Sequence, residues 1–242
     1  MNVKKPSILA VIPARGGSKR IKNKNIRLFA GKPLIAHSII QALSLPFVDR
    51  VIVDTDSRAI AAVARKYGAE VPFLRPKHLA QDTSQMVDSL LHLLAELAHE
   101  SYTPEYLLLL QATSPLREST DIEAAWKLMR KGGSTTTLCV CPTHPQLYYL
   151  GKKGELELVN TPRRYSSNTQ AWRDAYILNG SFAYIVDVQA LKREKRIVTS
   201  KTRAVVCPKW RSVDVDTPEE WVLAEALYKQ RGMIAKKIHN FK

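Results

Sequence analysis

Short apolar runs alternate along the chain with segments in which apolar residues recur at helical spacing. The first run, at 8–12 (Ile-Leu-Ala-Val-Ile), is apolar throughout, which is typical of a strand covered on both faces. A loop rich in glycine and lysine follows, and after Pro33 the apolar residues recur every three or four positions, as in an amphipathic helix. The pattern predicts strands at 8–12, 50–55, 70–74, 106–110 and 135–140, and helices that begin near Pro33, at Ser57, at Thr83 or Ser84, and at a Thr120-x-x-Glu123 capping box.

This alternation predicts an α/β fold with a mostly parallel, doubly wound sheet and helices on both faces. The rhythm changes at 142–178, a segment rich in proline, glycine, tyrosine and arginine, which we interpret as an inserted arm that leaves the main sheet. A strand at 181–186 then returns. The segment 217–220 (Thr-Pro-Glu-Glu) predicts the start of the last helix, with a capping threonine, a proline in the first turn and acidic neighbours. We expect 1–242 to form a single domain that carries this arm.

Composition and cysteine content exclude several classes of protein. The 242 residues are 45% hydrophobic and 24% charged, which is ordinary for a globular chain and excludes a disordered or fibrous one. Three cysteines are too few for a disulfide framework, and Cys139 and Cys141 lack the spacing of a metal site, so we expect buried strand thiols. No apolar run approaches the roughly 18 residues of a membrane helix, and the stretch after Lys4-Lys5 is too short for a signal peptide. We therefore expect a cytoplasmic protein without membrane insertion.

Positive charge is concentrated near the start of the chain. There are 37 lysines and arginines against 22 acidic residues, so the formal net charge is +15. Residues 1–48 contain nine of the basic side chains and no acidic one. Such a cluster favours a polyanionic partner, which could be a nucleic acid, a membrane surface or a nucleoside triphosphate. A nucleic-acid-binding module would need aromatic residues among the cations for stacking, and 1–48 offers only Phe29 and Phe47.

The loop at 12–25 (Ile-Pro-Ala-Arg-Gly-Gly-Ser-Lys-Arg-Ile-Lys-Asn-Lys-Asn) carries the strongest chemical signal. It follows the first strand, and ligands of open α/β sheets bind at the carboxyl ends of strands. Gly16 and Gly17 allow backbone N–H groups to approach an anion, and Ser18 adds a donor. The loop matches neither the G-x-x-x-x-G-K-[ST] nor the G-x-G-x-x-G pattern. Because it also contains Arg15, Lys19 and Lys24, it predicts a triphosphate site.

This loop resembles the nucleotide-binding signature of the acylneuraminate cytidylyltransferases, the CMP-sialic acid synthetase family, which includes legionaminate and pseudaminate cytidylyltransferases. Further blocks of the family follow in the same order, and together they extend from about residue 8 to residue 228, nearly the whole chain. They are 49–56 (DRVIVDTD), 73–76 (FLRP) with 79–82 (LAQD), 110–117 (LQATSPLR), 170–181, which ends in Asn-Gly-Ser, and 214–217 (DVDT).

The resemblance implies a nucleotide-diphospho-sugar transferase-like, Rossmann-like fold and a single nucleotidyltransferase domain. It implies a reaction of surface-glycan biosynthesis in which the anomeric hydroxyl of a nine-carbon 2-keto acid sugar attacks the α-phosphorus of CTP. The products would be a CMP-sugar and pyrophosphate. It also implies Mg²⁺ as cofactor, and a homodimer in which the 142–178 arm reaches the neighbouring subunit's site.

The family pattern assigns roles to particular residues. It implies that Arg15, Lys24 and Asp216 are catalytic and that Asp214 and Asp216 bind Mg²⁺. Two carboxylates at i and i+2 of an extended segment point to the same side, which agrees with a shared cation. The alternative is that Asp216 caps the last helix with Thr217. The implied nucleotide ligands are Arg15, Gly16, Ser18, Lys19, Lys24, Asn25, Arg75 and Gln111, and the implied sugar ligands are Gln170, Tyr176 and Asn179. Arg163 and Arg164 are further candidates, because the carboxylate of the acid sugar needs a cation.

Several assignments stay open at this level. Asp54 and Asp56 are candidates to line the site, but Asp56 could instead cap the next helix with Ser57. Arg117 either contacts phosphate or pairs across a loop. The stretch before Tyr176 lacks the Arg-Gln-Asp-x-Pro pattern of many family members, so sialic, legionaminic and pseudaminic acids all remain candidate substrates. A nucleotidylyltransferase for another sugar is the second interpretation, and a basic nucleic-acid-binding protein is a remote third.

Overall fold

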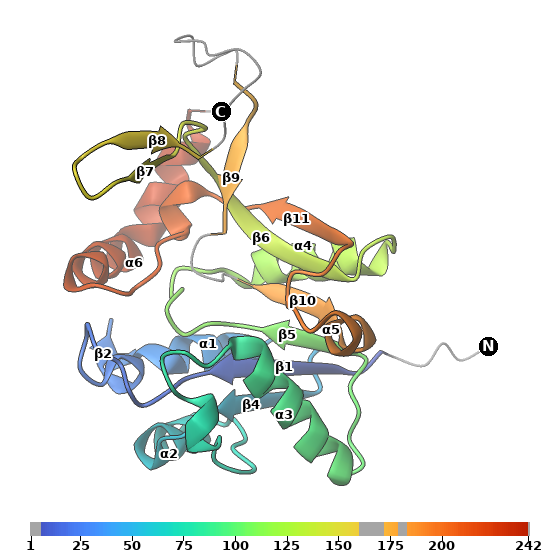
Figure 1. Ribbon diagram of the computed structural model, residues 1–242. Coiled ribbons are helices and arrows are strands. Elements are labelled where there is room, and N and C mark those ends of the chain that lie inside the picture. Colours follow the sequence, from blue (N-terminus) through green and yellow to red (C-terminus); the bar gives the residue numbers. More distant parts are fainter. Residues whose placement is uncertain (1–5, 160–171, 179–182, 242) are drawn as a thin grey trace.

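A seven-stranded sheet with helices on both faces organises the described part of the chain (Figure 1). The computed structural model describes residues 6–159, 172–178 and 183–241. In one half of the sheet, β1 (Ile8–Pro13) lies between the edge strand β4 (Arg50–Asp54) and β5 (Tyr106–Leu109) and runs parallel to both. The carboxyl ends of these three strands therefore meet at one edge of the sheet.

The other half of the sheet contains one strand of opposite direction. β10 (Tyr184–Asp187) is antiparallel both to β5 and to β6 (Thr136–Thr143). β11 (Thr202–Val206) pairs with β6 in parallel at the outer edge. β6 and β11 therefore run in the same direction as β1, β4 and β5. The mostly parallel α/β sheet expected from the sequence is confirmed.

Alternating side chains explain why helices cover both faces. Successive strand residues point to opposite faces, so Ala10 and Ile12 pack against one helix layer while Leu9 and Val11 pack against the other. All four are fully buried. The first layer consists of α1 (Leu34–Leu43), α2 (Arg58–Lys66) and α4 (Ser119–Arg130), and the second of α3 (Met86–His99) and α5 (Val188–Glu194).

A third apolar cluster joins the last helix to the segment that follows the first loop. α6 (Pro218–His239) buries Trp221 in the same cluster as Phe29, and the two rings meet edge to face with centroids 5.5 Å apart. Phe29 belongs to a small hairpin of β2 (Leu28–Phe29) and β3 (Lys32–Pro33). This packing places the start of α6 beside the loop after β1.

Most of the predicted elements are confirmed. Strands form at 8–12, 50–54, 106–109 and 136–140 as parts of β1, β4, β5 and β6, and α1 follows Pro33. Ser57 caps α2 by accepting a hydrogen bond from the Ile60 N–H at 3.4 Å. The predicted start of α6 is also present, because Glu220 Oε2 accepts the Thr217 N–H at 2.8 Å and Thr217 Oγ1 accepts the Glu220 N–H at 3.3 Å. The strand predicted at 181–186 lies partly outside the described residues, and β10 is its described part.

The strand predicted at 70–74 is wrong. Glu70 forms one isolated bridge with Ile52, and the chain then leaves the sheet. Pro72 interrupts the run, and proline has no N–H to donate to a ladder. The Arg75 N–H donates to the Thr55 carbonyl at 2.8 Å, which returns the chain to the carboxyl end of β4.

The predicted start of α4 is also wrong. The helix begins at Ser119, and Asp121 accepts the Glu118 N–H at 3.0 Å, so the capping box lies two residues before Thr120 and Glu123. Asp121 also receives two hydrogen bonds of 2.8 and 2.9 Å from the buried guanidinium of Arg211. This ion pair favours the earlier start, and it ties the 3₁₀ turn at Lys209–Arg211 to α4.

α3 begins at Met86 with Gln85 before it, so neither Thr83 nor Ser84 is its cap. The Ser84 hydroxyl is used elsewhere, because it donates to the His78 carbonyl at 2.7 Å. Two elements, α5 and β11, carry sequence signals too weak for prediction. α5 has seven residues, and β11 is an edge strand with largely exposed side chains.

The cysteines agree with the expectation of buried strand thiols. Cys139, Cys141 and Cys207 are buried, free thiols, as the strand interpretation predicted for the first two. Among the described helices, none is both long and apolar enough to cross a lipid bilayer.

The described part of 142–178 adds the seventh strand, which pairs with the end of β6 off the main path of the sheet, and a separate hairpin. β6 continues to Thr143, and β9 (Ala175–Ile177) pairs antiparallel with its end. β7 (Tyr148–Leu150) and β8 (Leu156–Leu158) form a separate hairpin. In Figure 1 these strands project beyond the sheet on the side of α6.

Candidate functional site

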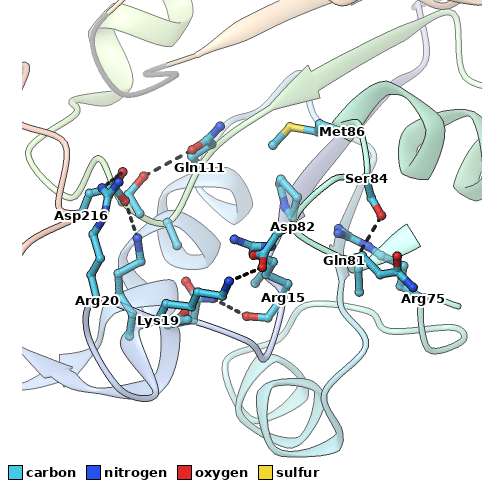
Figure 2. A pocket seen from close by; sticks show the side chains of 18 of the residues that line it. Arg15, Lys19, Arg20, Arg75, Gln81, Asp82, Ser84, Met86, Gln111 and Asp216 are labelled. Carbon is cyan, nitrogen blue, oxygen red and sulfur yellow. Dashed lines mark hydrogen bonds and ion pairs between the residues drawn. The ribbon is translucent and has the colours of Figure 1, made fainter. Parts of the chain in front are cut away.

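A cavity of about 550 Å³ opens at the carboxyl ends of β1 and β5. Four segments line it: the loop at 13–25 after β1, the segment 75–86 before α3, the residues 111–113 after β5, and the segment before α6 that carries Asp214 and Asp216. Figure 2 shows their side chains converging on a common space. The fold therefore brings together segments that are far apart in the sequence, at the sheet edge where the loop was expected to bind a ligand.

The cations of the loop form ion pairs with two carboxylates. Arg15 Nη1 lies 2.8 Å from Asp82 Oδ1, and Lys19 Nζ contacts the other oxygen of the same carboxylate. On the opposite side of the cavity, Lys24 Nζ lies 2.6 Å from Asp216 Oδ1, and Arg20 Nη1 lies 3.6 Å from Asp216 Oδ2. The hydrogen bonds from Lys19 and Arg15 hold the pKa of the Asp82 carboxyl below its ordinary value. The Asp82 carboxyl is therefore charged at neutral pH.

The four cations differ in how deeply they lie. Lys24 is the most enclosed, with 15% of its side chain exposed, and its ammonium also donates to the Val215 carbonyl at 3.1 Å. Lys19 and Arg20 are 75% and 68% exposed. Lys24 is thus held in one position beside Asp216, whereas the two exposed side chains can move to meet a ligand.

Gly16 has a different role from the one predicted. Its N–H donates to Asp56 Oδ1 at 2.8 Å, and Gly16 is not among the residues that line the cavity. A Cβ at this position would lie 3.1 Å from the Ser57 Cβ, which is tighter than ordinary packing. Glycine therefore allows the loop to pass close to the start of α2. Asp56 anchors the loop here while Ser57 caps the helix, which settles the question left open for Asp56.

The other predicted loop residues line the cavity. Ser18 and Asn25 are both part of its wall. Asn25 is buried, and its side-chain amide donates to the Arg15 carbonyl at 3.2 Å, so it holds the loop in shape.

Asp214 and Asp216 both line the cavity, and their surroundings differ. Asp214 Oδ1 is buried and has no hydrogen-bond partner among the described residues. Burial raises the pKa of the Asp214 carboxyl, and a hydrogen bond from Thr113 acts in the opposite direction. The Asp216 carboxylate faces Lys24 and Arg20, and Thr217 is the residue that caps α6. The alternative in which Asp216 serves only as a cap is therefore wrong.

This pair of carboxylates fits a hard divalent cation. A buried carboxylate oxygen without a donor, next to a second carboxylate on the same extended segment, is a ligand arrangement suited to Mg²⁺. Within the described residues, no cluster of three or more His, Cys, Asp or Glu side chains is placed to hold a metal. Remaining ligands would have to come from water or from phosphate oxygens, as is usual for Mg²⁺ sites that act on nucleotides.

Arg75 lines the cavity on the side away from Asp216, whereas Gln111 lies nearer to Asp216 (Figure 2). Arg75 is buried, with its Nη2 2.6 Å from Asp54 Oδ2, and its Nε has no hydrogen-bond partner among the described residues. Asp54 therefore positions Arg75 and does not itself line the cavity. Gln111 Oε1 accepts a hydrogen bond of 3.4 Å from Thr113 Oγ1. Both residues offer N–H groups that a nucleotide could use.

Arg117 is a structural residue. It is buried outside the cavity, where its Nε donates to Gln41 Oε1 at 2.7 Å and its Nη2 to Ser38 Oγ at 2.8 Å. Burial lowers the pKa of Arg117 to about 10. Of the two interpretations of this residue, pairing across a loop is the one confirmed.

Of the five predicted sugar ligands, the structure describes Tyr176 alone. Arg163, Arg164, Gln170 and Asn179 lie outside the described residues. Tyr176 is on β9, 47% exposed, and does not line the cavity.

Sequence reasoning missed several residues of the cavity wall, among them Arg20, Gln81, Ser84 and Met86, and it gave no role to Asp82. Asp82 did carry a signal, because it ends the 79–82 block. Its ion pairs with Arg15 and Lys19 could not be read from that block.

Comparison with known proteins agrees with this geometry. A family model described as cytidylyltransferase matches residues 9–232. The CMP-N,N'-diacetyllegionaminic acid synthase of Legionella pneumophila is 37% identical over 227 residues, which cover 91% of this chain and 95% of that protein. The pseudaminic acid cytidylyltransferase of Campylobacter jejuni is 32% identical over 91% of this chain and 96% of its own length.

A solved structure with the same fold is CMP:2-keto-3-deoxy-manno-octonic acid synthetase complexed with CTP. It superposes with a TM-score of 0.70 over 93% of this chain and 99% of that chain, at 19% identity. The family match spans nearly the whole chain, and the resemblance stated from the sequence is confirmed: this chain belongs to the cytidylyltransferase family of nucleotidyltransferases.

Proposed function

We propose that this protein transfers the cytidylyl group of CTP to a nine-carbon 2-keto acid sugar, giving a CMP-sugar and pyrophosphate. The observation that carries the proposal is the convergence of four loop cations and two carboxylates on one cavity. The names of the relatives from Legionella pneumophila and Campylobacter jejuni support the choice of sugar acid. The higher identity to the first makes a legionaminic-type acid the first candidate substrate.

In this reaction the anomeric hydroxyl of the sugar loses its proton, and its oxygen forms a bond to the α-phosphorus of CTP. The bond from that phosphorus to the bridging oxygen breaks, and pyrophosphate leaves with the electron pair. Such a transfer depends on positioning and on neutralising phosphate charge more than on covalent help from the protein.

The site residues divide these tasks by position. We assign the triphosphate to Arg15, Lys19 and Lys24, with Ser18 and Asn25 in the same wall. Lys24, enclosed beside Asp216, is the cation best placed to neutralise charge at the reacting phosphate. Arg75 and Gln111 would contact the nucleoside part. Gly16 would not contact the nucleotide, since its N–H donates to Asp56. Its role would be to let the loop pass close to the start of α2.

Asp214 and Asp216 would hold Mg²⁺. Bound there, the ion would neutralise charge on phosphate oxygens as it develops. We place the reaction in the cytoplasm, because free thiols are typical of a reducing compartment.

We also propose that the 142–178 arm joins two copies of the chain. Its hairpin exposes Tyr149 and Leu150 by 63% and 73%, and Leu156 by 66%. Large apolar side chains gathered on a projecting hairpin are typical of an interface. The proposed sugar ligands Gln170, Tyr176, Asn179, Arg163 and Arg164 belong to this arm or adjoin it, and in the proposed dimer the arm of one copy reaches the nucleotide cavity of the other.

The reaction is tested by pyrophosphate release with Mg²⁺ and each of the four nucleoside triphosphates. The sugar panel should contain sialic, legionaminic, pseudaminic and 3-deoxy-octulosonic acids. We expect release with CTP and a nine-carbon acid only. If folded protein that binds CTP releases no pyrophosphate with any nine-carbon acid, the proposed sugar substrate is wrong.

Replacing Asp216 by alanine tests the metal pair. We expect kcat to fall about 100-fold or more, because charge stabilisation at the phosphate is lost. The protein should still fold, with a thermal midpoint only a few degrees lower, because Asp216 is 45% exposed and exposed ion pairs contribute little free energy each. The matched control is Glu219→Ala, which removes an exposed acid in the first turn of α6, and this variant should keep the wild-type activity. Full activity of Asp216→Ala at saturating Mg²⁺ would remove Asp216 from the metal site.

Light scattering tests the dimer. At micromolar concentration the wild type should have about twice the chain mass of 27.3 kDa. The double variant Tyr149→Ser/Leu150→Ser should shift toward the monomer, whereas Leu43→Ser, an exposed leucine at the end of α1, should not. A monomeric wild type would contradict the proposed role of the arm.

A further inference from the structure

Asp82 occupies the position in which phosphate oxygens are expected. Its two carboxylate oxygens bind Arg15 and Lys19, the two cations that the proposed function assigns to the triphosphate. All three side chains line the cavity (Figure 2), and Asp82 is 49% exposed. The N–H donors that bind this carboxylate are not available to phosphate, so Asp82 competes with a nucleotide for these two cations.

The carboxylate is held in place by a built turn. The Ser84 N–H donates to the Gln81 carbonyl at 3.2 Å, and the Gln81 N–H donates to Ser84 Oγ at 3.1 Å. Ser84 Oγ in turn donates to the His78 carbonyl at 2.7 Å. Asp82 therefore sits inside a closed turn, and the hydrogen bonds that close it come from other residues. A change in its charge would alter the contacts to the cations and leave the turn intact.

The relative charges decide which anion holds the cations. One carboxylate carries a single negative charge, whereas CTP and pyrophosphate carry several, so a bound nucleotide displaces Asp82. The ion pairs of Asp82 with Arg15 and Lys19 are exposed, and exposed ion pairs contribute little free energy each. Asp82 can therefore weaken the binding of an anion without preventing it.

We propose that Asp82 is an internal competitor for pyrophosphate. It holds Arg15 and Lys19 in the free enzyme, gives them up to CTP, and takes them back as the product pyrophosphate leaves. The inference rests on the proposed function, because it needs a triphosphate at these two cations. In this role Asp82 is a positioning residue: it reduces affinity for CTP and in exchange prevents the enzyme from being held by its own product.

The test compares Asp82→Asn with the wild type by calorimetry, using inorganic pyrophosphate and CTP, each with Mg²⁺ and without sugar. Asparagine is well tolerated in turns, so the variant is expected to fold. We expect both ligands to bind Asp82→Asn about two- to tenfold more tightly, with the gain shrinking as salt is raised. In steady state the KM for CTP and the inhibition constant of pyrophosphate should fall by the same factor, and kcat should not rise.

Two controls isolate the effect. Asp82→Glu keeps a carboxylate and should restore affinities near those of the wild type. Glu70→Gln makes the same charge change at an acid that is 45% exposed, pairs with Arg50 and lies outside the cavity, and it should change neither affinity. This control excludes a general effect of net charge.

The outcomes separate this inference from the function beneath it. If the wild type binds both anions and Asp82→Asn binds them equally or more weakly, the role of Asp82 is overturned and the nucleotide site stands. If the folded wild type binds neither CTP nor pyrophosphate, the nucleotide assignment fails, and the role of Asp82 fails with it.

Discussion

The loop after β1 concentrates Arg15, Lys19, Arg20 and Lys24 within ten residues of sequence, and this density of charge is the constraint on which the site depends. Like charges held close together repel one another, so a folded loop of this kind needs negative partners when no ligand is present. Asp82 and Asp216 provide them, one on each side of the cavity. The same two carboxylates must release the cations when a polyanion binds. The free protein is therefore stabilised by contacts that its substrate has to replace.

The fold supplies these partners from distant parts of the chain. β1 runs parallel to its neighbours β4 and β5, so the segments after β1, β4 and β5 all begin at one edge of the sheet. The turn at 81–84 brings Asp82 there from the segment before α3. Asp214 and Asp216 arrive along an extended segment fixed at both ends, by the buried Arg211–Asp121 pair before it and by the capped start of α6 after it. Because both anchors are rigid, the proposed metal ligands are positioned by the frame of the protein and not by a free loop.

Local patterns predicted much of this structure. The apolar run of β1 and the Thr217 cap are encoded by neighbouring residues, and both were confirmed. The loop after β1 lines the cavity, while its binding of a triphosphate stays a prediction. The errors arise where a distant residue decides the outcome. Arg211 binds Asp121 and favours an earlier start of α4. Asp56 accepts the Gly16 N–H that was expected to face an anion. Asp82 pairs with two cations that lie more than sixty residues away in the sequence. An ion pair between remote residues leaves no periodic trace in the sequence, so its geometry has to come from the fold.

The central claim is that the cavity between Asp82 and Asp216 receives the triphosphate of CTP. A crystal structure of the protein with CTP and Mg²⁺ tests it most directly. We expect phosphate oxygens bound to Arg15, Lys19 and Lys24. The Arg15–Asp82 and Lys24–Asp216 ion pairs should then be separated, and a metal ion should lie at Asp214 and Asp216. A nucleotide bound elsewhere, or bound in this cavity with both ion pairs intact, would contradict it.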